Sequence, residues 1–72
     1  MTDYQTKKAI FAERLRKLLK EKGKTQIGLT REIDISYGSM YRYVHAMSFP
    51  RGYTLDLLAK GLGCSKSDLT GE

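Results

Sequence analysis

Apolar residues recur at intervals of three and four along most of this sequence, and no segment alternates apolar and polar residues as a strand does. The pattern is clearest in two segments, which hold Ile10, Phe11, Leu15, Leu18 and Leu19, and Leu55, Leu58, Ala59 and Leu62. A period near 3.6 residues places such side chains on one face of a helix, where they can pack into a core. The sequence therefore predicts an all-α fold, a compact bundle of about five short helices.

Residues that favour helix ends divide the chain into segments. Thr25 and Ser36 suit N-caps, Gly23 and Gly63 suit left-handed turns at C-termini, and Ser65 with Asp68 matches a capping box. Thr2 with Gln5, or else Thr6, can cap the first helix. The predicted helices cover about residues 5–22, 26–33, 36–44 and 53–62, and a last turn near 65–69 brings Leu69 into the core.

The size of the chain points to a single domain over residues 1–72, without an internal disulfide because Cys64 is the only cysteine. No apolar run follows Met1, so we expect no signal peptide or membrane-spanning helix, and the cytoplasm is the expected compartment. Thirteen Lys and Arg against eight Asp and Glu give a formal charge of +5. An excess of this size often reflects solubility alone, so its distribution matters more than its total.

The segment 35–55 contains no acidic residue. On a helix over 36–44, one face is apolar and holds Met40, Val44 and Met47, with Tyr43 at its edge. The opposite face is polar and holds Gly38, Tyr41, Arg42 and His45, flanked by Tyr37 and Ser39. Outward tyrosines beside an arginine, without acids, suit a polyanion with hydrogen-bonding edges, and therefore favour nucleic acid. Tyr and Arg are also enriched in protein interfaces, so this pattern leaves a protein partner open.

The stretch TQIGLTREIDISYGSMYRYVHAMSFP resembles the helix-turn-helix of the phage Cro and CI-type repressors, the XRE-like family. The family's characteristic positions hold Gln26, Thr30, Asp34, Met40 and Tyr43 in this sequence. RLRKLLKEKGKTQ and LDLLAKGLGCSKSDL resemble the helices before and after the motif, so the similarity covers about residues 13–69. It implies a lambda-repressor-like domain with a motif over about 25–45, and a double-stranded DNA partner. We expect a temperate-phage or prophage repressor that binds an operator.

The resemblance also implies roles for individual residues. In this family the helix that begins near residue 36 lies in the major groove, which assigns base reading to Tyr37, Gly38, Tyr41 and Arg42. Contacts with phosphates are assigned to Gln26, Ser36, Ser39, Ser48 and Arg51. Gln26 can alternatively be a simple helix cap, and Arg51 a solvated loop charge.

Two residues depart from the family pattern. Thr30 stands where alanine is usual, so its hydroxyl must find a carbonyl between the two motif helices. Asp34 stands where glycine is usual, at a turn that requires a left-handed backbone. Both residues can be accommodated, because Thr is small and Asp tolerates that conformation.

Other chemistries find little support in the sequence. His45 and Cys64 occur once each, so no metal site or cofactor is expected, and no catalytic set points to an enzyme. Cys64 is expected to be a buried, inert thiol. His45 is either a phosphate contact or an exposed spectator.

Two other functions are possible on the same scaffold. One is a protein-interaction module of antitoxin or anti-repressor type, and the other is a single-stranded RNA binder. A homodimer on DNA, or through a missing C-terminal region, is a further possibility.

Overall fold

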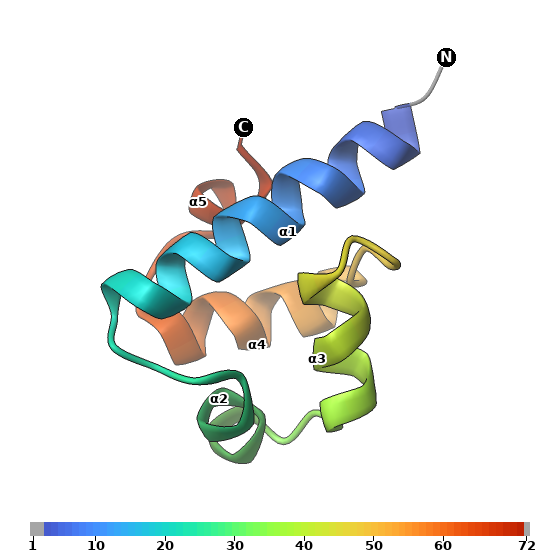
Figure 1. Ribbon diagram of the computed structural model, residues 1–72. Helices are drawn as coiled ribbons and strands as arrows, with labels where there is room; N and C mark the ends of the chain where they lie inside the picture. Colours follow the sequence, from blue (N-terminus) through green and yellow to red (C-terminus); the bar gives the residue numbers. More distant parts are fainter. Residues whose placement is uncertain (1–2, 72) are drawn as a thin grey trace.

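The computed structural model describes residues 3–71, and within them it contains five helices and no strand (Figure 1). The helices are α1 (Asp3–Glu21), α2 (Gln26–Ile33), α3 (Tyr37–Val44), α4 (Gly52–Leu62) and α5 (Lys66–Thr70). The predicted all-α fold is confirmed, and the predicted helix ends lie within about two residues of these bounds. Thr6 lies inside α1 and does not cap it, and Thr2 lies outside the described residues.

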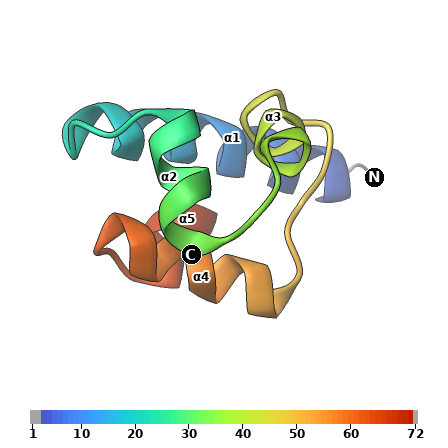
Figure 2. The ribbon, with the colours of Figure 1, turned by 90° about the horizontal axis from the view of Figure 1, so that it is seen from below.

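The long α1 runs across the domain and packs against α3 and α5, while α2 packs against α3 and α4 (Figures 1 and 2). Each helix turns its apolar face inward, because only there can those side chains leave water. The fully buried large side chains form one core, to which every helix contributes: Phe11, Leu15, Leu29, Met40, Val44, Leu58, Leu62 and Leu69. Leu69 shows that even the five-residue α5 belongs to this core.

Hydroxyl side chains begin α2, α3 and α5, as the sequence predicts. The Thr25 Oγ1 accepts a hydrogen bond from the Gly28 N–H at 2.9 Å, and the Ser36 Oγ accepts one from the Ser39 N–H at 3.1 Å. Ser65 and Asp68 form a reciprocal capping box. Each of these bonds satisfies an amide that the helix itself leaves free, and so fixes where the helix starts.

The turn between α2 and α3 accommodates both departures from the family pattern. Asp34 has a left-handed backbone, with φ of 59°, and its N–H donates to the Thr30 carbonyl at 3.1 Å. The buried Thr30 hydroxyl donates to the Ile27 carbonyl at 2.6 Å, within its own helix. A threonine with this bond leaves no unsatisfied hydroxyl where the two motif helices meet.

Two residues of the predicted apolar faces, Met47 and Ile10, are exposed, and so is Ile27. Met47 is 58% exposed because α3 ends at Val44 and Ala46 turns the chain away with φ of 60°. Ile27, on the first turn of α2, is 53% exposed, and Ile10 on α1 is also exposed. The periodicity identifies one side of a helix, but it does not show where neighbouring helices stop covering that side.

Candidate nucleic-acid interface

Helix α3 has one side in the core and the other at the surface. Met40 and Val44 are 0% and 1% exposed, so the side opposite them faces outward. Tyr37 and Tyr41 are 50% and 46% exposed, and Gly38 and Arg42 are exposed beside them. We call these four residues the recognition face. The structure therefore brings the predicted base-reading residues together on the outer side of a helix that contains no acidic residue.

Two contacts from α1 hold α3 in place from behind, and a third holds the loop that follows α3. The Phe11 ring of α1 meets the Tyr43 ring edge-on, with centroids 6.0 Å apart, and packs on the Phe49 ring at 5.4 Å. The Arg16 guanidinium of α1 donates a hydrogen bond to the Val44 carbonyl at the end of α3. Sequence reasoning missed the Arg16 contact, because no local pattern tells which distant carbonyl an arginine will reach. Together these contacts fix both the tilt and the C-terminal end of α3.

The N-terminus of α3 offers hydrogen-bond donors to an anion. The Ser36 hydroxyl donates to the Ser39 Oγ at 3.0 Å while accepting from the Ser39 N–H. Because Ser36 uses its hydrogen in this bond, the hydrogen of the Ser39 hydroxyl remains available to another acceptor. The N–H groups of the first helical turn also lack acceptors within the helix, and they carry the positive end of its dipole.

Gln26 occupies the equivalent place on α2, as its first helical residue, and is half-buried. Thr25 caps this helix, so the alternative interpretation of Gln26 as the helix cap is wrong. As the first residue of α2, Gln26 lies at a helix N-terminus, where a phosphate oxygen is favoured. The structure therefore provides two helix N-termini, those of α2 and α3, in neighbouring parts of the motif.

The loop after α3 turns back sharply and leads into α4. Ala46 occupies the left-handed position, and Met47 closes the turn by donating its N–H to the Arg42 carbonyl at 2.8 Å. Phe49 then anchors the loop on Phe11. The two predicted loop contacts differ: Ser48 is half-buried, while Arg51 is exposed and makes no side-chain cap for α4. The Arg51 guanidinium is therefore at the surface of the domain, at the N-terminus of α4.

One contact on α3 was not predicted. The rings of Tyr41 and His45 lie against each other, with centroids 4.1 Å apart and planes inclined by 39°. Their spacing of four residues is the signal that could have found the pair, since side chains four apart on a helix are neighbours. His45 is exposed, as both of its interpretations require, and it is in contact with a residue of the recognition face.

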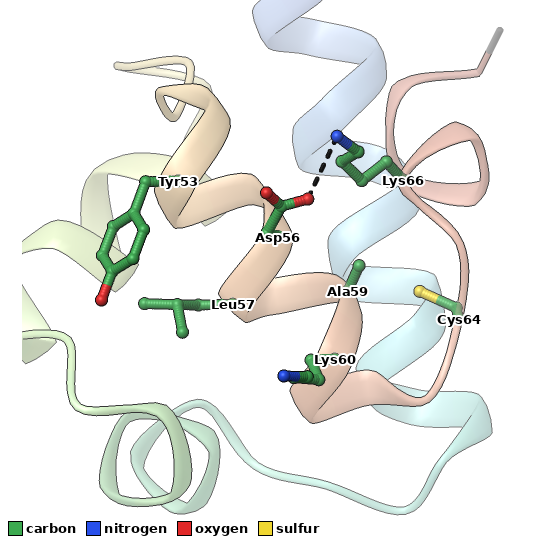
Figure 3. A pocket seen from close by; sticks show the side chains of 7 residues that line it. All are labelled: Tyr53, Asp56, Leu57, Ala59, Lys60, Cys64 and Lys66. Carbon is green, nitrogen blue, oxygen red and sulfur yellow. Dashed lines mark ion pairs between the residues drawn. The ribbon is translucent and has the colours of Figure 1, made fainter.

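A hollow lies on α4 and the start of α5 (Figure 3). It measures about 530 Å³ and is lined by Tyr53, Asp56, Leu57, Ala59, Lys60, Cys64 and Lys66. Asp56 and Lys66 form an exposed ion pair at 3.1 Å across its rim.

Cys64 is half-buried, which is less than the predicted burial. Its burial and the nearby Asp68 carboxylate raise the pKa of its thiol. Such a thiol is a poor nucleophile near neutral pH.

The part of the chain that the structure describes, residues 3–71, holds no group of three His, Cys, Asp or Glu side chains placed to bind a metal ion. Among the same residues, no helix is both long enough and apolar enough to cross a membrane.

Comparison with known proteins identifies this motif. A family model described as the Cro/C1-type HTH DNA-binding domain matches residues 14–71. No curated protein and no solved structure matches the chain significantly. The match spans α2, α3, α4 and α5, the left-handed turn at Asp34 and the last eight residues of α1. The chain belongs to the Cro/C1-type family of helix-turn-helix DNA-binding domains.

Proposed function

We propose that this protein is a sequence-specific transcriptional repressor of phage or prophage origin, which binds operator DNA by placing α3 in the major groove. The observation that carries the proposal is the recognition face, where Tyr37, Gly38, Tyr41 and Arg42 are exposed together on a helix without an acid. A helix of this diameter fits the major groove, where each base pair presents a distinct set of donors and acceptors.

Within this proposal the four residues have different tasks. Arg42 has the donor geometry for a bidentate contact with the O6 and N7 atoms of guanine. The two tyrosines offer a hydroxyl to bases or phosphates and a ring to a thymine methyl group. A Cβ built on Gly38 meets nothing nearer than the Ser36 Oγ, at 3.9 Å, so the absent side chain is not required by packing. Gly38 instead lets the helix backbone approach the bases.

The phosphate contacts would lie on both sides of the recognition face. Gln26 and the free Ser39 hydroxyl face one strand near the N-termini of α2 and α3, together with Ser36. Ser48 and Arg51, in the loop after α3, face the other strand. Contacts of this kind fix the orientation of the domain on the duplex, and the charged ones make affinity depend on salt.

Repression follows from occupancy, because a protein bound across a promoter excludes the polymerase. A homodimer would place two copies of α3 on one face of the duplex, at half-sites about 34 Å apart or at a multiple of that distance. The operator would then be an inverted repeat.

The test is a selection from a random pool of duplex DNA at low salt, with the wild type, Arg42→Ala and Arg51→Ala in parallel. Both variants lose one exposed arginine. We expect the wild type to enrich a short motif. Arg42→Ala should lose about 1–3 kcal/mol of binding free energy and relax the preference at one or two base pairs. Arg51→Ala should instead weaken binding to all sequences alike. It should also reduce the slope of log affinity against log salt concentration by about one, the value for one lost phosphate contact.

Two outcomes would contradict these assignments. If Arg42→Ala weakened all sequences equally, Arg42 would be a phosphate contact. If the folded wild type enriched no motif, and bound duplex DNA without the steep decrease in affinity on adding salt, the tyrosine-rich surface would belong to a protein interface of the antitoxin or anti-repressor kind.

A further inference from the structure

We infer that His45 is a positioning residue for Tyr41, which holds the tyrosine ring in one orientation and thereby sharpens the base preference that Tyr41 contributes. The inference rests on the proposed function, since it assigns a role within the proposed recognition face. Its basis is the ring contact on α3, with centroids 4.1 Å apart and planes inclined by 39°.

The direction of helical side chains explains why His45 reaches Tyr41. His45 is the C-cap of α3, and its N–H still donates to the Tyr41 carbonyl at 3.1 Å. Because Cα–Cβ bonds at such a position point toward the helix N-terminus, its ring leans back over the turn that carries Tyr41. Both side chains are exposed, so the contact is made at the surface and not forced by the core. An aromatic contact of this kind at a spacing of four residues stabilises one relative arrangement of the two rings.

Without that contact, the Tyr41 side chain would exchange between two χ1 orientations. A tyrosine on a helix has two accessible χ1 wells, because the third clashes with the preceding turn. The two wells send the phenol hydroxyl to different places in the groove. Tyr43, on the same helix, is fixed by the Phe11 ring in the core. Tyr41 is 46% exposed and has no such core contact. The His45 ring restrains it instead.

A restrained ring and a free ring read DNA differently. A ring that changes orientation can satisfy more than one base pair, and flexible surfaces are the usual means of accepting several partners. A ring that is already oriented loses less rotamer freedom on binding and penalises the wrong base pair. His45 is therefore expected to affect discrimination between sequences. A histidine that simply touched a phosphate would raise affinity for all sequences alike.

The experiment measures binding of the selected operator and of its single-base-pair variants at one salt concentration. Tyr41→Ala first identifies the base pair that Tyr41 reads. His45→Ala is then expected to reduce discrimination at that base pair by about two- to tenfold, the range of an aromatic pair. His45→Phe, which keeps a flat ring, is expected to restore it, and His45→Gln is not. In the Tyr41→Ala background, His45→Ala should change nothing further.

A second measurement does not involve DNA. The χ1 angle of Tyr41, from three-bond NMR couplings in the free protein, should report one orientation in the wild type and in His45→Phe. It should report averaging between two orientations in His45→Ala. Thermal unfolding is expected to show that these exposed substitutions leave the fold intact.

The outcomes separate the two proposals. If the wild type shows no preference among duplexes, the proposed function fails and the inference fails with it. If the wild type and Tyr41→Ala behave as described, but His45→Ala weakens all sequences equally or keeps full discrimination, the inference alone is wrong. It is also wrong if His45→Phe resembles His45→Ala, since the ring would then have no part in the effect.

Discussion

Helices α2 and α3 are both eight residues long, and each follows a hydroxyl side chain that caps its first turn. Their outer sides differ. That of α2 mixes Arg31 and Glu32, and Glu32 pairs with Lys24 at 2.9 Å. The outer side of α3 carries the recognition face, with no acid and no ion pair within the residues described.

The inner sides differ as well. α2 lies so close to α4 that a Cβ on Gly61 would come within 2.5 Å of the Ile33 Cγ2 atom. α3 is held by core side chains, by the Phe11 ring and by the Arg16 hydrogen bond. A short helix is thus positioned in two different ways in this domain. One is a close fit to a single neighbour, and the other is several contacts from behind that leave the front free for a ligand.

The largest expected effect tests whether α3 is anchored as firmly as α2. Leu29 of α2 and Met40 of α3 are both fully buried. Truncating either to alanine removes apolar contacts and leaves a cavity, so Leu29→Ala and Met40→Ala should each lower the free energy of unfolding by about 2–5 kcal/mol. Urea unfolding measures the free energy of unfolding of both variants. A cost below 1 kcal/mol for Met40→Ala alone would show that α3 is loosely docked.

The close fit of α2 predicts the next effect. In Gly61→Ala the new methyl group would overlap the Ile33 side chain and, at 2.8 Å, the Leu29 Cδ1 atom. Overpacking of this kind outweighs the better helix propensity of alanine, so the free energy of unfolding should decrease by about 1–2 kcal/mol. Gly52→Ala is the matched control, because nothing lies within 4 Å of its Cβ. Equal unfolding free energies for the two variants would contradict the close approach of α2 and α4.

The end of α3 gives a prediction of opposite sign. Ala46 has φ of 60°, a conformation in which its Cβ is strained, whereas Gly63 takes the same role after α4. Ala46→Gly should therefore raise the free energy of unfolding by about 1 kcal/mol. Ala9→Gly, within α1, should lower it by a similar amount. Differential scanning calorimetry measures the stability of both variants relative to the wild type. A loss of stability in Ala46→Gly would contradict the strain at Ala46.

The smallest expected effect on stability comes from Gly38→Ala, which should change stability and DNA affinity in opposite directions. Gly38→Ala adds a methyl group on the open side of α3, with helical backbone and no close contact, so stability should rise by about 0.5–1 kcal/mol. The same methyl group stands where the helix backbone is proposed to approach the bases, so affinity for the operator should fall. Titration of labelled operator with both proteins measures this, and unchanged affinity would remove Gly38 from the base-reading set.

The sequence was sufficient for features that depend on local chemistry. Thr25, Ser36, Asp34 and Gly63 each have the predicted role at a helix end, because caps and left-handed turns involve only a few neighbouring residues. The direction of the recognition face was also predicted correctly, since it follows from the helical repeat.

Features that depend on distant parts of the chain were missed. Met47 is exposed although the periodicity puts it on the apolar face, because α3 ends at Val44. The left-handed Ala46 gives no sign in the sequence, since alanine is ordinarily a helix former. The Arg16 hydrogen bond joins residues that are 28 positions apart, and only the packing of α1 on α3 brings them together. The assigned DNA contacts of the individual side chains stay predictions.

The tyrosines of α3 also give the protein two kinds of spectroscopic reporter, one packed against the core and one at the surface. The chain has five tyrosines and no tryptophan, so tyrosine dominates its near-ultraviolet signal. Tyr43, held against Phe11, contributes circular dichroism that depends on fixed tertiary packing and disappears when that packing is lost. Tyr37 and Tyr41 are at the surface, where a ligand would change their surroundings first. Unfolding and binding can thus be followed by label-free optical measurements on the unmodified chain.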